Sequence, residues 1–171
     1  MKLYHFSEEQ DIRDFVPRRF PSEPPSAPAM VWTIDEEHAP HYYFPRDCPR
    51  VCLWCGEGTT ASDRERFFGL SETSRIIAIE AGWYDRVRRG RIYRYRFESG
   101  PFQLQDVNAG YYTATEPVQA VAVDQIDDLV QTLVQEGIEL RVTPSLWPLV
   151  DAVLNSTVSF SMIRMRNATP R

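Results

Sequence analysis

Three cysteines and two histidines form the densest group of potential metal ligands in the sequence. His38, His41, Cys48, Cys52 and Cys55 lie within 18 residues, and Cys52 and Cys55 form a Cys-x-x-Cys pair. Zinc binds nitrogen and sulfur ligands of these types in tetrahedral geometry. However, such pairs normally sit on a tight turn, whereas residues three apart in an apolar strand point to opposite faces. The pattern favours three small apolar thiols in a core and two histidines on the surface, and we expect no bound metal.

A run of arginines interleaved with tyrosines extends from Arg86 to Arg96 and contains six arginines. Arginine can grip phosphates and tyrosine can stack on bases, which is the chemistry of single-stranded nucleic-acid binding. Arginine at alternate positions also protects an edge strand against unwanted pairing. Because the whole chain carries a formal net charge of −5, bulk electrostatics disfavour nucleic acid. Nucleic acid is therefore a weaker expectation than a small ligand, although the run keeps it open.

Several single polar residues stand where they could contact a ligand. His5 lies inside an apolar strand and must have a partner there; such a histidine is more often structural than catalytic. Glu116 directly follows a predicted strand. Arg46 and Arg50 lie between a predicted helix and a predicted strand, where they could contact an anion. The sequence lacks Gly-x-Ser-x-Gly, Gly-x-Gly-x-x-Gly and Walker A motifs, which argues against a serine hydrolase, a Rossmann enzyme and a P-loop enzyme.

Short strands with a few helices would position these residues. β-branched and aromatic residues, and apolar alternation, predict strands over 3–6, 30–34, 50–54, 75–81, 91–97, 111–115, 138–142 and 158–162. Capping residues and helical spacing predict short helices over 8–13, 36–44 and 63–69. Two longer amphipathic helices are expected, one capped by Asp124 and ending at Gly137, the other capped by Ser145.

This order predicts an α+β fold, because the strands crowd together and do not alternate regularly with helices. We expect a single domain over residues 1–171, with a mixed, mostly antiparallel sheet of about seven strands and two C-terminal amphipathic helices. Residues 17–29 should form an exposed loop inside this domain, since five of the 13 prolines lie there.

Composition and the N-terminal sequence indicate the cellular compartment in which we expect the protein. Of the 171 residues 43% are apolar, enough for a sizeable core, and no apolar run approaches the ~18 residues that a membrane span requires. The N-terminus turns acidic at once and lacks a signal-peptide core. Three clustered cysteines make a poor disulfide framework. We therefore expect a cytoplasmic protein without a membrane partner.

Two stretches resemble ADP-ribosyltransferase-like folds. The segment Leu3-Tyr4-His5-Phe6 resembles their first strand, and Val31-Trp32-Thr33-Ile34 resembles the second. Residues 112–118, with Glu116, resemble the strand that carries the late glutamate. The resemblance implies an ADP-ribosyltransferase-like architecture that acts on NAD or on another nucleotide-bearing substrate.

The same resemblance implies roles for individual residues. His5 would hold the ribose of NAD, and Tyr42 or Tyr43 would stack on the nicotinamide. Thr33 would line the site on the second strand. Glu116 would polarise the ribose hydroxyl at the reacting carbon, where a carboxylate stabilises oxocarbenium character. The alternative is a non-enzymatic module that binds a nucleotide, RNA or a protein through the same cleft or through the Arg86–Arg96 surface.

Nearly the whole chain also resembles a family of bacterial proteins of unknown function and of about this length. The resemblance lies in the Tyr-His-Phe-Ser opening, in Phe-Pro-Arg-Asp-Cys-Pro-Arg over residues 44–50, and in Ile-Arg-Met-Arg-Asn-Ala over residues 163–168. It implies a shared fold and no known activity.

Overall fold

The computed structural model describes residues 1–21 and 23–171, which divide into two compact units. Unit 1 consists of residues 1–43 and 92–126, and unit 2 consists of residues 44–91 and 127–171. The proline-rich segment 17–29 belongs to unit 1, and its described residues are mostly exposed; residue 22 lies outside the described residues. A single domain over the whole chain stays a prediction.

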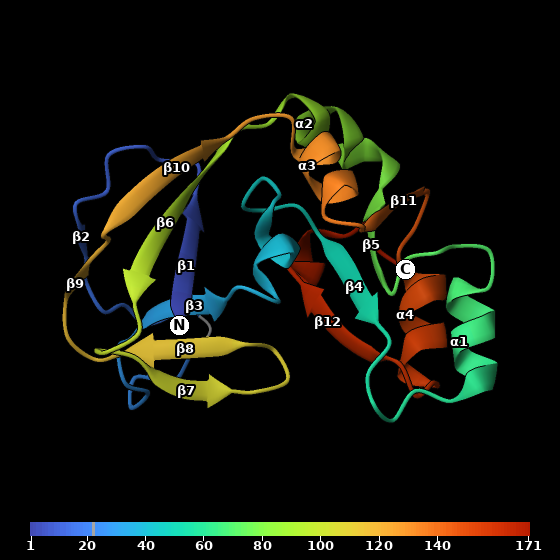
Figure 1. The fold of residues 1–171 in the computed structure, drawn as a ribbon, viewed down its shortest axis with the longest axis horizontal. Helices are drawn as coiled ribbons and strands as arrows, with labels where there is room; N and C mark the ends of the chain where they lie inside the picture. Colours follow the sequence, from blue (N-terminus) through green and yellow to red (C-terminus); the bar gives the residue numbers. More distant parts are fainter. Residues whose placement is uncertain (22) are drawn as a thin grey trace. The chain divides into compact units, whose positions relative to one another are not determined.

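Unit 1 is built on an antiparallel sheet of six strands, in the order β10-β6-β1-β3-β8-β7 (Figure 1). A short ribbon of β2 and β9 and the 3-10 helix η1 complete it. The bounds are β1 (Lys2–Ser7), β2 (Asp14–Phe15), β3 (Val31–Asp35), η1 (Ala39–Tyr42), β6 (Ile92–Glu98), β7 (Gln103–Asp106), β8 (Tyr111–Ala114), β9 (Val118–Gln119) and β10 (Ala122–Ile126).

The core of unit 1 follows from the alternation of β6, as predicted. Tyr93, Tyr95 and Phe97 point into one apolar cluster, and Arg94 and Arg96 alternate with them. The cluster also receives aromatic and aliphatic residues from the neighbouring strands, namely Leu3, Phe15, Val31, Phe102, Ala114 and Val118. Because successive strand residues face opposite sides, β6 buries one face in this cluster and presents arginines on the other.

Unit 2 is built on a four-stranded sheet in the order β11-β5-β4-β12, in which β11 is parallel to β5 and the other pairs are antiparallel. The bounds are β4 (Arg50–Trp54), α1 (Ala61–Phe68), β5 (Arg75–Glu80), η2 (Ala81–Trp83), α2 (Tyr84–Arg89), α3 (Leu129–Gln135), β11 (Glu139–Thr143), α4 (Trp147–Leu154), β12 (Ser159–Ile163) and η3 (Met165–Asn167). No helix in the described part of the chain is long and apolar enough to cross a bilayer.

Helices α1 and α4 lie side by side and contribute to the core of unit 2 (Figure 1). Phe67 and Phe68 of α1 and Val150 and Val153 of α4 are buried there. They pack on side chains from the two central strands, namely Val51, Leu53, Ile76 and Ala78. Burying each of the phenylalanine, valine, leucine and isoleucine side chains stabilises the unit by about 1.5–3 kcal/mol. The apolar run at 75–80 is thus a central strand, as predicted.

The α+β class and the mostly antiparallel pairing are confirmed, but the predicted single sheet of about seven strands is not what the structure shows. The described strands fall into three sheets. Strand β7 has only exposed residues, and β2 and β9 have two residues each. Strands of this kind produce no hydrophobic alternation, so the sequence pattern could not reveal them.

Two predicted short helices are wrong. Residues 8–13 are not helical, because the Tyr95 hydroxyl donates to the Glu9 carbonyl (2.6 Å) and accepts from the Ile12 amide (3.2 Å). The helix predicted over 36–44 is only a turn followed by η1. Asp35 accepts from the His38 amide at 2.9 Å in that turn, but it does not cap a helix: the N-cap of η1 is His38, and Pro40 lacks the amide that a longer α-helix would need.

The predictions for the second half of the chain are confirmed in part. Asp124 does not begin a helix: residues 122–126 form β10 and pair with β6, and Asp128 caps α3 instead. Helix α4 forms with Pro148 in its first turn, as predicted, but its N-cap is Leu146. The 91–97 strand is not at an edge, since β6 lies between β1 and β10. Pairing with β6 overrode the helical periodicity over 124–126.

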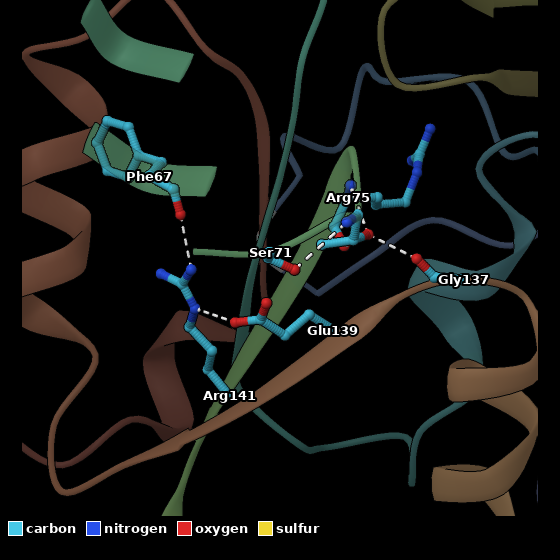
Figure 2. Close-up of polar contacts among 7 residues, drawn as sticks. Phe67, Ser71, Arg75, Gly137, Glu139 and Arg141 are labelled. Carbon is cyan, nitrogen blue, oxygen red and sulfur yellow. Dashed lines mark hydrogen bonds and ion pairs between the residues drawn. The ribbon is translucent and has the colours of Figure 1, made fainter. Parts of the chain in front are cut away.

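A polar cluster ties residues 137–141, which include the start of the edge strand β11, to the end of α1 and the loop that follows it (Figure 2). Arg141 donates to Glu139 and to the Phe67 carbonyl, each at 2.6 Å. Thr73 donates to the Gly137 carbonyl at 2.5 Å. Burial raises the pKa of Glu139, but hydrogen bonds from Arg141 and Ser71 and the charge of Arg141 outweigh it, so this pKa lies below the usual value.

We predict that this cluster makes the stability of the protein sensitive to acid. Because the pKa of Glu139 is lowered in the folded protein, its contribution is present above the ordinary glutamate pKa and is lost as pH falls through the lowered one. Glu139→Gln should therefore flatten the fall in stability below about pH 4.5, measured by urea unfolding between pH 7 and pH 3. Glu57→Gln, at an exposed position in the turn after β4, is the control and should change the slope less than Glu139→Gln does. Parallel pH profiles for wild type and Glu139→Gln would contradict the assignment.

Candidate functional site

The residues expected to hold NAD do not gather on one face of unit 1. His5 and Phe6 are neighbours on β1, so their side chains point to opposite faces of the sheet. The His5 ring packs edge-on against Phe15 (5.0 Å between ring centres), and its Nδ1 lies 3.0 Å from the Trp32 carbonyl oxygen. Phe6 instead stacks on Tyr42 (6.2 Å between ring centres). The imidazole and the tyrosines are thus separated by the strand.

The other members of the expected NAD site are placed as follows. Tyr43 is 2% exposed and packs edge-on against Phe6. The Tyr42 hydroxyl lies 2.7 Å from the Tyr111 hydroxyl. Buried Thr33 donates to the Tyr112 carbonyl at 3.0 Å.

Glu116 is exposed and lies in the turn before β9, at a shallow hollow of about 330 Å³ lined by Phe97, Phe102 and Val118 among others. This carboxylate is therefore open to solvent.

The potential metal ligands among the histidines and cysteines are buried or hydrogen-bonded within the fold. His38 and His41 are buried, not at the surface as predicted, and the His38 Nδ1 lies 2.8 Å from an Asp35 carboxylate oxygen. Cys48 and Cys52 are buried, and burial raises the pKa of each thiol to about 12, so neither is a ready thiolate ligand. Among the described residues, no three histidine, cysteine or acidic side chains converge as a metal site would require.

The Arg86–Arg96 run does not form one element. Arg86, Arg88 and Arg89 lie on α2 in unit 2, whereas Arg94 and Arg96 lie on β6 in unit 1. Ion pairs neutralise part of the run: Asp85 contacts Arg88 at 3.3 Å, and Asp124 contacts Arg94 at 3.2 Å. The regular spacing in the sequence therefore does not correspond to a continuous cationic strand.

Arg46 and Arg50, the residues expected to contact an anion, are joined by two arginines from the other end of the chain. Strand β12 pairs with β4 so that Ile163 stands opposite Arg50, which brings Arg164 and Arg166 to the same end of the sheet. Just beyond, the Asn167 side-chain amide donates to the Asp47 carbonyl at 2.7 Å. We call Arg46, Arg50, Arg164 and Arg166 the arginine cluster. All four belong to unit 2.

The members of the cluster differ in depth. Arg50 is 2% exposed; it donates to the Cys48 carbonyl at 2.7 Å, and its guanidinium lies 5.0 Å from the centre of the Phe44 ring. Arg164 is half-buried, while Arg46 and Arg166 are exposed. The cluster thus has a buried base and a solvent-accessible rim.

Arg164 feels the positive charge of its neighbours. Burial lowers the pKa of Arg164 first, and Arg166, Arg46 and Arg50 lower it further, while Asp47 acts in the opposite direction. Within the part of the chain that the structure describes, neither Arg164 nor Arg166 forms an ion pair with a carboxylate. Among the described residues, no ion pair therefore neutralises the charges of these two arginines.

The backbone of Arg164 carries a second unfavourable feature. Its φ of 56° and ψ of 29° lie in the left-handed region, which costs a side chain with a Cβ roughly 1–2 kcal/mol. Residues held in such conformations cluster at functional sites, where the surrounding structure enforces them. A strained arginine among other arginines is therefore a candidate for function.

Clustered guanidinium groups are chemically suited to anion recognition. Guanidinium groups donate paired hydrogen bonds to phosphate and carboxylate, and they remain charged at any physiological pH. The sequence analysis named Arg46 and Arg50 as candidate anion contacts, which stays a prediction, and did not single out Arg164 and Arg166. The available signal was the segment Ile-Arg-Met-Arg-Asn-Ala, where two arginines follow the last predicted strand directly.

We predict that Arg164→Gly stabilises the fold. Glycine adopts the left-handed region without penalty, so relief of about 1–2 kcal/mol outweighs the roughly 0.5–1 kcal/mol that glycine loses through its greater unfolded-state freedom. Arg164→Ala removes the same charge but keeps the strained backbone, and is the matched control. Urea unfolding should rank Arg164→Gly above Arg164→Ala by about 0.5–1 kcal/mol. The reverse order would contradict backbone strain at this residue.

Comparisons with known proteins agree with one of the two resemblances seen in the sequence. No curated protein and no solved structure matches the chain, so no relative of known activity supports the transferase resemblance. A model of a family of unknown function, DUF6886, matches residues 4–168 and so includes both segments that carry the arginine cluster. The chain therefore belongs to this family of unknown function.

Proposed function

We propose that this protein binds a small molecule with a terminal phosphate group, such as a nucleoside monophosphate, through the arginine cluster. The observation that carries this function is the placement of Arg164, which is half-buried and held in a strained conformation among like charges. A protein gains nothing in stability from such an arrangement. An anion that bridges the guanidinium groups would relieve the repulsion between them. The strained backbone would then serve to hold Arg164 in position for this anion.

The charge of the site favours a dianion over a monoanion. Three arginines and one carboxylate, Asp47, act on the charge of Arg164, so positive charge predominates around this side chain. A phosphate monoester carries about −1.5 to −2 at neutral pH, whereas a carboxylate or an internal phosphodiester carries only a single charge. Each phosphate oxygen also accepts several hydrogen bonds, which suits donors that approach from two chain segments.

Of the two functions that the sequence suggested, this proposal prefers the non-enzymatic binding module to the ADP-ribosyltransferase. The transferase hypothesis requires His5 and a tyrosine at positions 42–43 to share one cleft, and these side chains lie on opposite faces of β1. The arginine cluster needs no such convergence in unit 1. NAD remains a useful test ligand, because its phosphates are internal and should bind the cluster more weakly than a terminal phosphate.

We predict that adenosine monophosphate raises the melting temperature of the protein. A ligand that binds only the folded state stabilises it by about 2.7 kcal/mol at a hundredfold excess over Kd. Adenosine, which lacks the phosphate, is the matched control and should have no effect, while inorganic phosphate should act in the same direction as the monophosphate. Calorimetric titration at low salt gives the affinities. Equal shifts with adenosine and its monophosphate would overturn the proposal.

We also predict that Arg166→Ala weakens binding of adenosine monophosphate about tenfold, which corresponds to about 1.4 kcal/mol. Arg166 is exposed at the rim, so its removal should not disturb folding. Arg64→Ala removes an equally exposed arginine from α1, outside the cluster, and should leave the affinity unchanged. If both variants bind like the wild type, the phosphate does not contact this rim.

A further inference from the structure

The last residues of the chain, 164–171, are held in unit 2 largely by side-chain bonds; we call them the C-terminal strap. Apart from the three residues of η3 they form no regular element. The Trp147 indole donates to the Thr169 carbonyl at 2.6 Å. Arg171 pairs with Asp151 at 2.8 Å, and its guanidinium lies 4.7 Å from the centre of the Trp147 ring.

The deepest anchor of the strap is Glu80, the last residue of β5. Its side chain is buried, with only 3% of the residue exposed, although glutamate is rarely buried. One carboxylate oxygen accepts from the Thr169 amide (2.9 Å) and the Thr169 hydroxyl (3.0 Å). The other lies 3.4 Å from the Leu146 amide, at the start of α4. Buried charge is tolerated only where donors satisfy it, and most of these donors come from the strap.

These contacts fix the backbone that carries two members of the arginine cluster. On one side, Ile163 is held in β12 opposite Arg50. On the other side, Thr169 is held by Glu80, and between them Asn167 is held by the Asp47 carbonyl. Arg164 and Arg166 therefore lie on a short segment that is fixed at both ends, despite the repulsion between their charges.

We propose that Glu80 is a positioning residue for phosphate binding: by anchoring Thr169 it holds Arg164 and Arg166 ready for the ligand. This inference rests on the proposed function and adds how the site is kept in place. A site that is ordered before binding avoids the entropic cost of ordering it on binding. Glu80 contacts no ligand; it acts only through the strap.

The test measures the affinity for adenosine monophosphate by calorimetric titration, at a temperature where every variant is folded. Glu80→Gln removes the charge from the anchor, and Thr169→Val removes only the hydroxyl group that donates to Glu80 and keeps the backbone amide. Each should weaken binding at least fivefold. Thr169→Ser keeps the hydroxyl and should restore wild-type affinity. Val153→Ala, in the core of unit 2 and outside the strap, is the control for general destabilisation: it should lower Tm and leave Kd within twofold of wild type.

A second measurement needs no ligand. Hydrogen exchange of the amides of residues 164–169 should become faster in Glu80→Gln and Thr169→Val, and it should stay at the wild-type rate in Val153→Ala. This readout separates release of the strap from a uniform loss of stability, since a uniform loss would speed exchange in the control as well.

The outcomes distinguish the two proposals. If the wild type shows no binding of adenosine monophosphate, the proposed function fails and this inference fails with it. If the wild type binds, and both anchor variants bind equally well, the positioning role of Glu80 is overturned while the proposed function stands. Weaker binding together with faster strap exchange, and rescue by Thr169→Ser, would support the positioning role.

Discussion

Antiparallel pairing between β4 and β12 brings together two segments that lie more than a hundred residues apart along the chain. The register that sets Ile163 opposite Arg50 also sets the residues after β12 beside the residues before β4. Like charges would otherwise keep these segments apart. The burial of Val51 and Leu53 of β4 among the side chains of α1 and α4 supplies the opposing free energy. The arginine cluster exists because an apolar sheet imposes it.

The polar residues around this sheet divide into those that stabilise the fold and those that strain it. Glu139 and Arg141 satisfy one another and fasten the edge strand, and Glu80 finds its donors in the strap. Arg164 has the opposite character, because both its backbone conformation and its neighbours are unfavourable. Local rules of stability are usually broken where function requires it, and this contrast is the reason for placing the candidate site at Arg164.

Unit 1 illustrates how strand periodicity limits chemistry. Because β1 alternates, its histidine belongs to the face of Phe15 and its phenylalanine to the face of Tyr42. Two residues that are adjacent in sequence therefore contact different side chains on opposite faces of the sheet. The same alternation on β6 buries three aromatic rings and leaves Arg94 and Arg96 on the other side. Residues that are close in sequence on a strand can form one site only if their side chains lie on the same face of the sheet.

The sequence by itself determined the α+β class, the central strand at 75–80, the two-faced strand β6 and most of the later helices, since each depends on periodicity within one segment. It also singled out Arg46 and Arg50 near a place suited to an anion. Only the tertiary structure decided that residues 124–126 pair as a strand, that Tyr95 holds residues 9–12 out of a helix, and that Arg164 and Arg166 join the other two arginines. These outcomes depend on contacts between segments distant along the chain, and local propensity carries no information about which distant partner a segment meets.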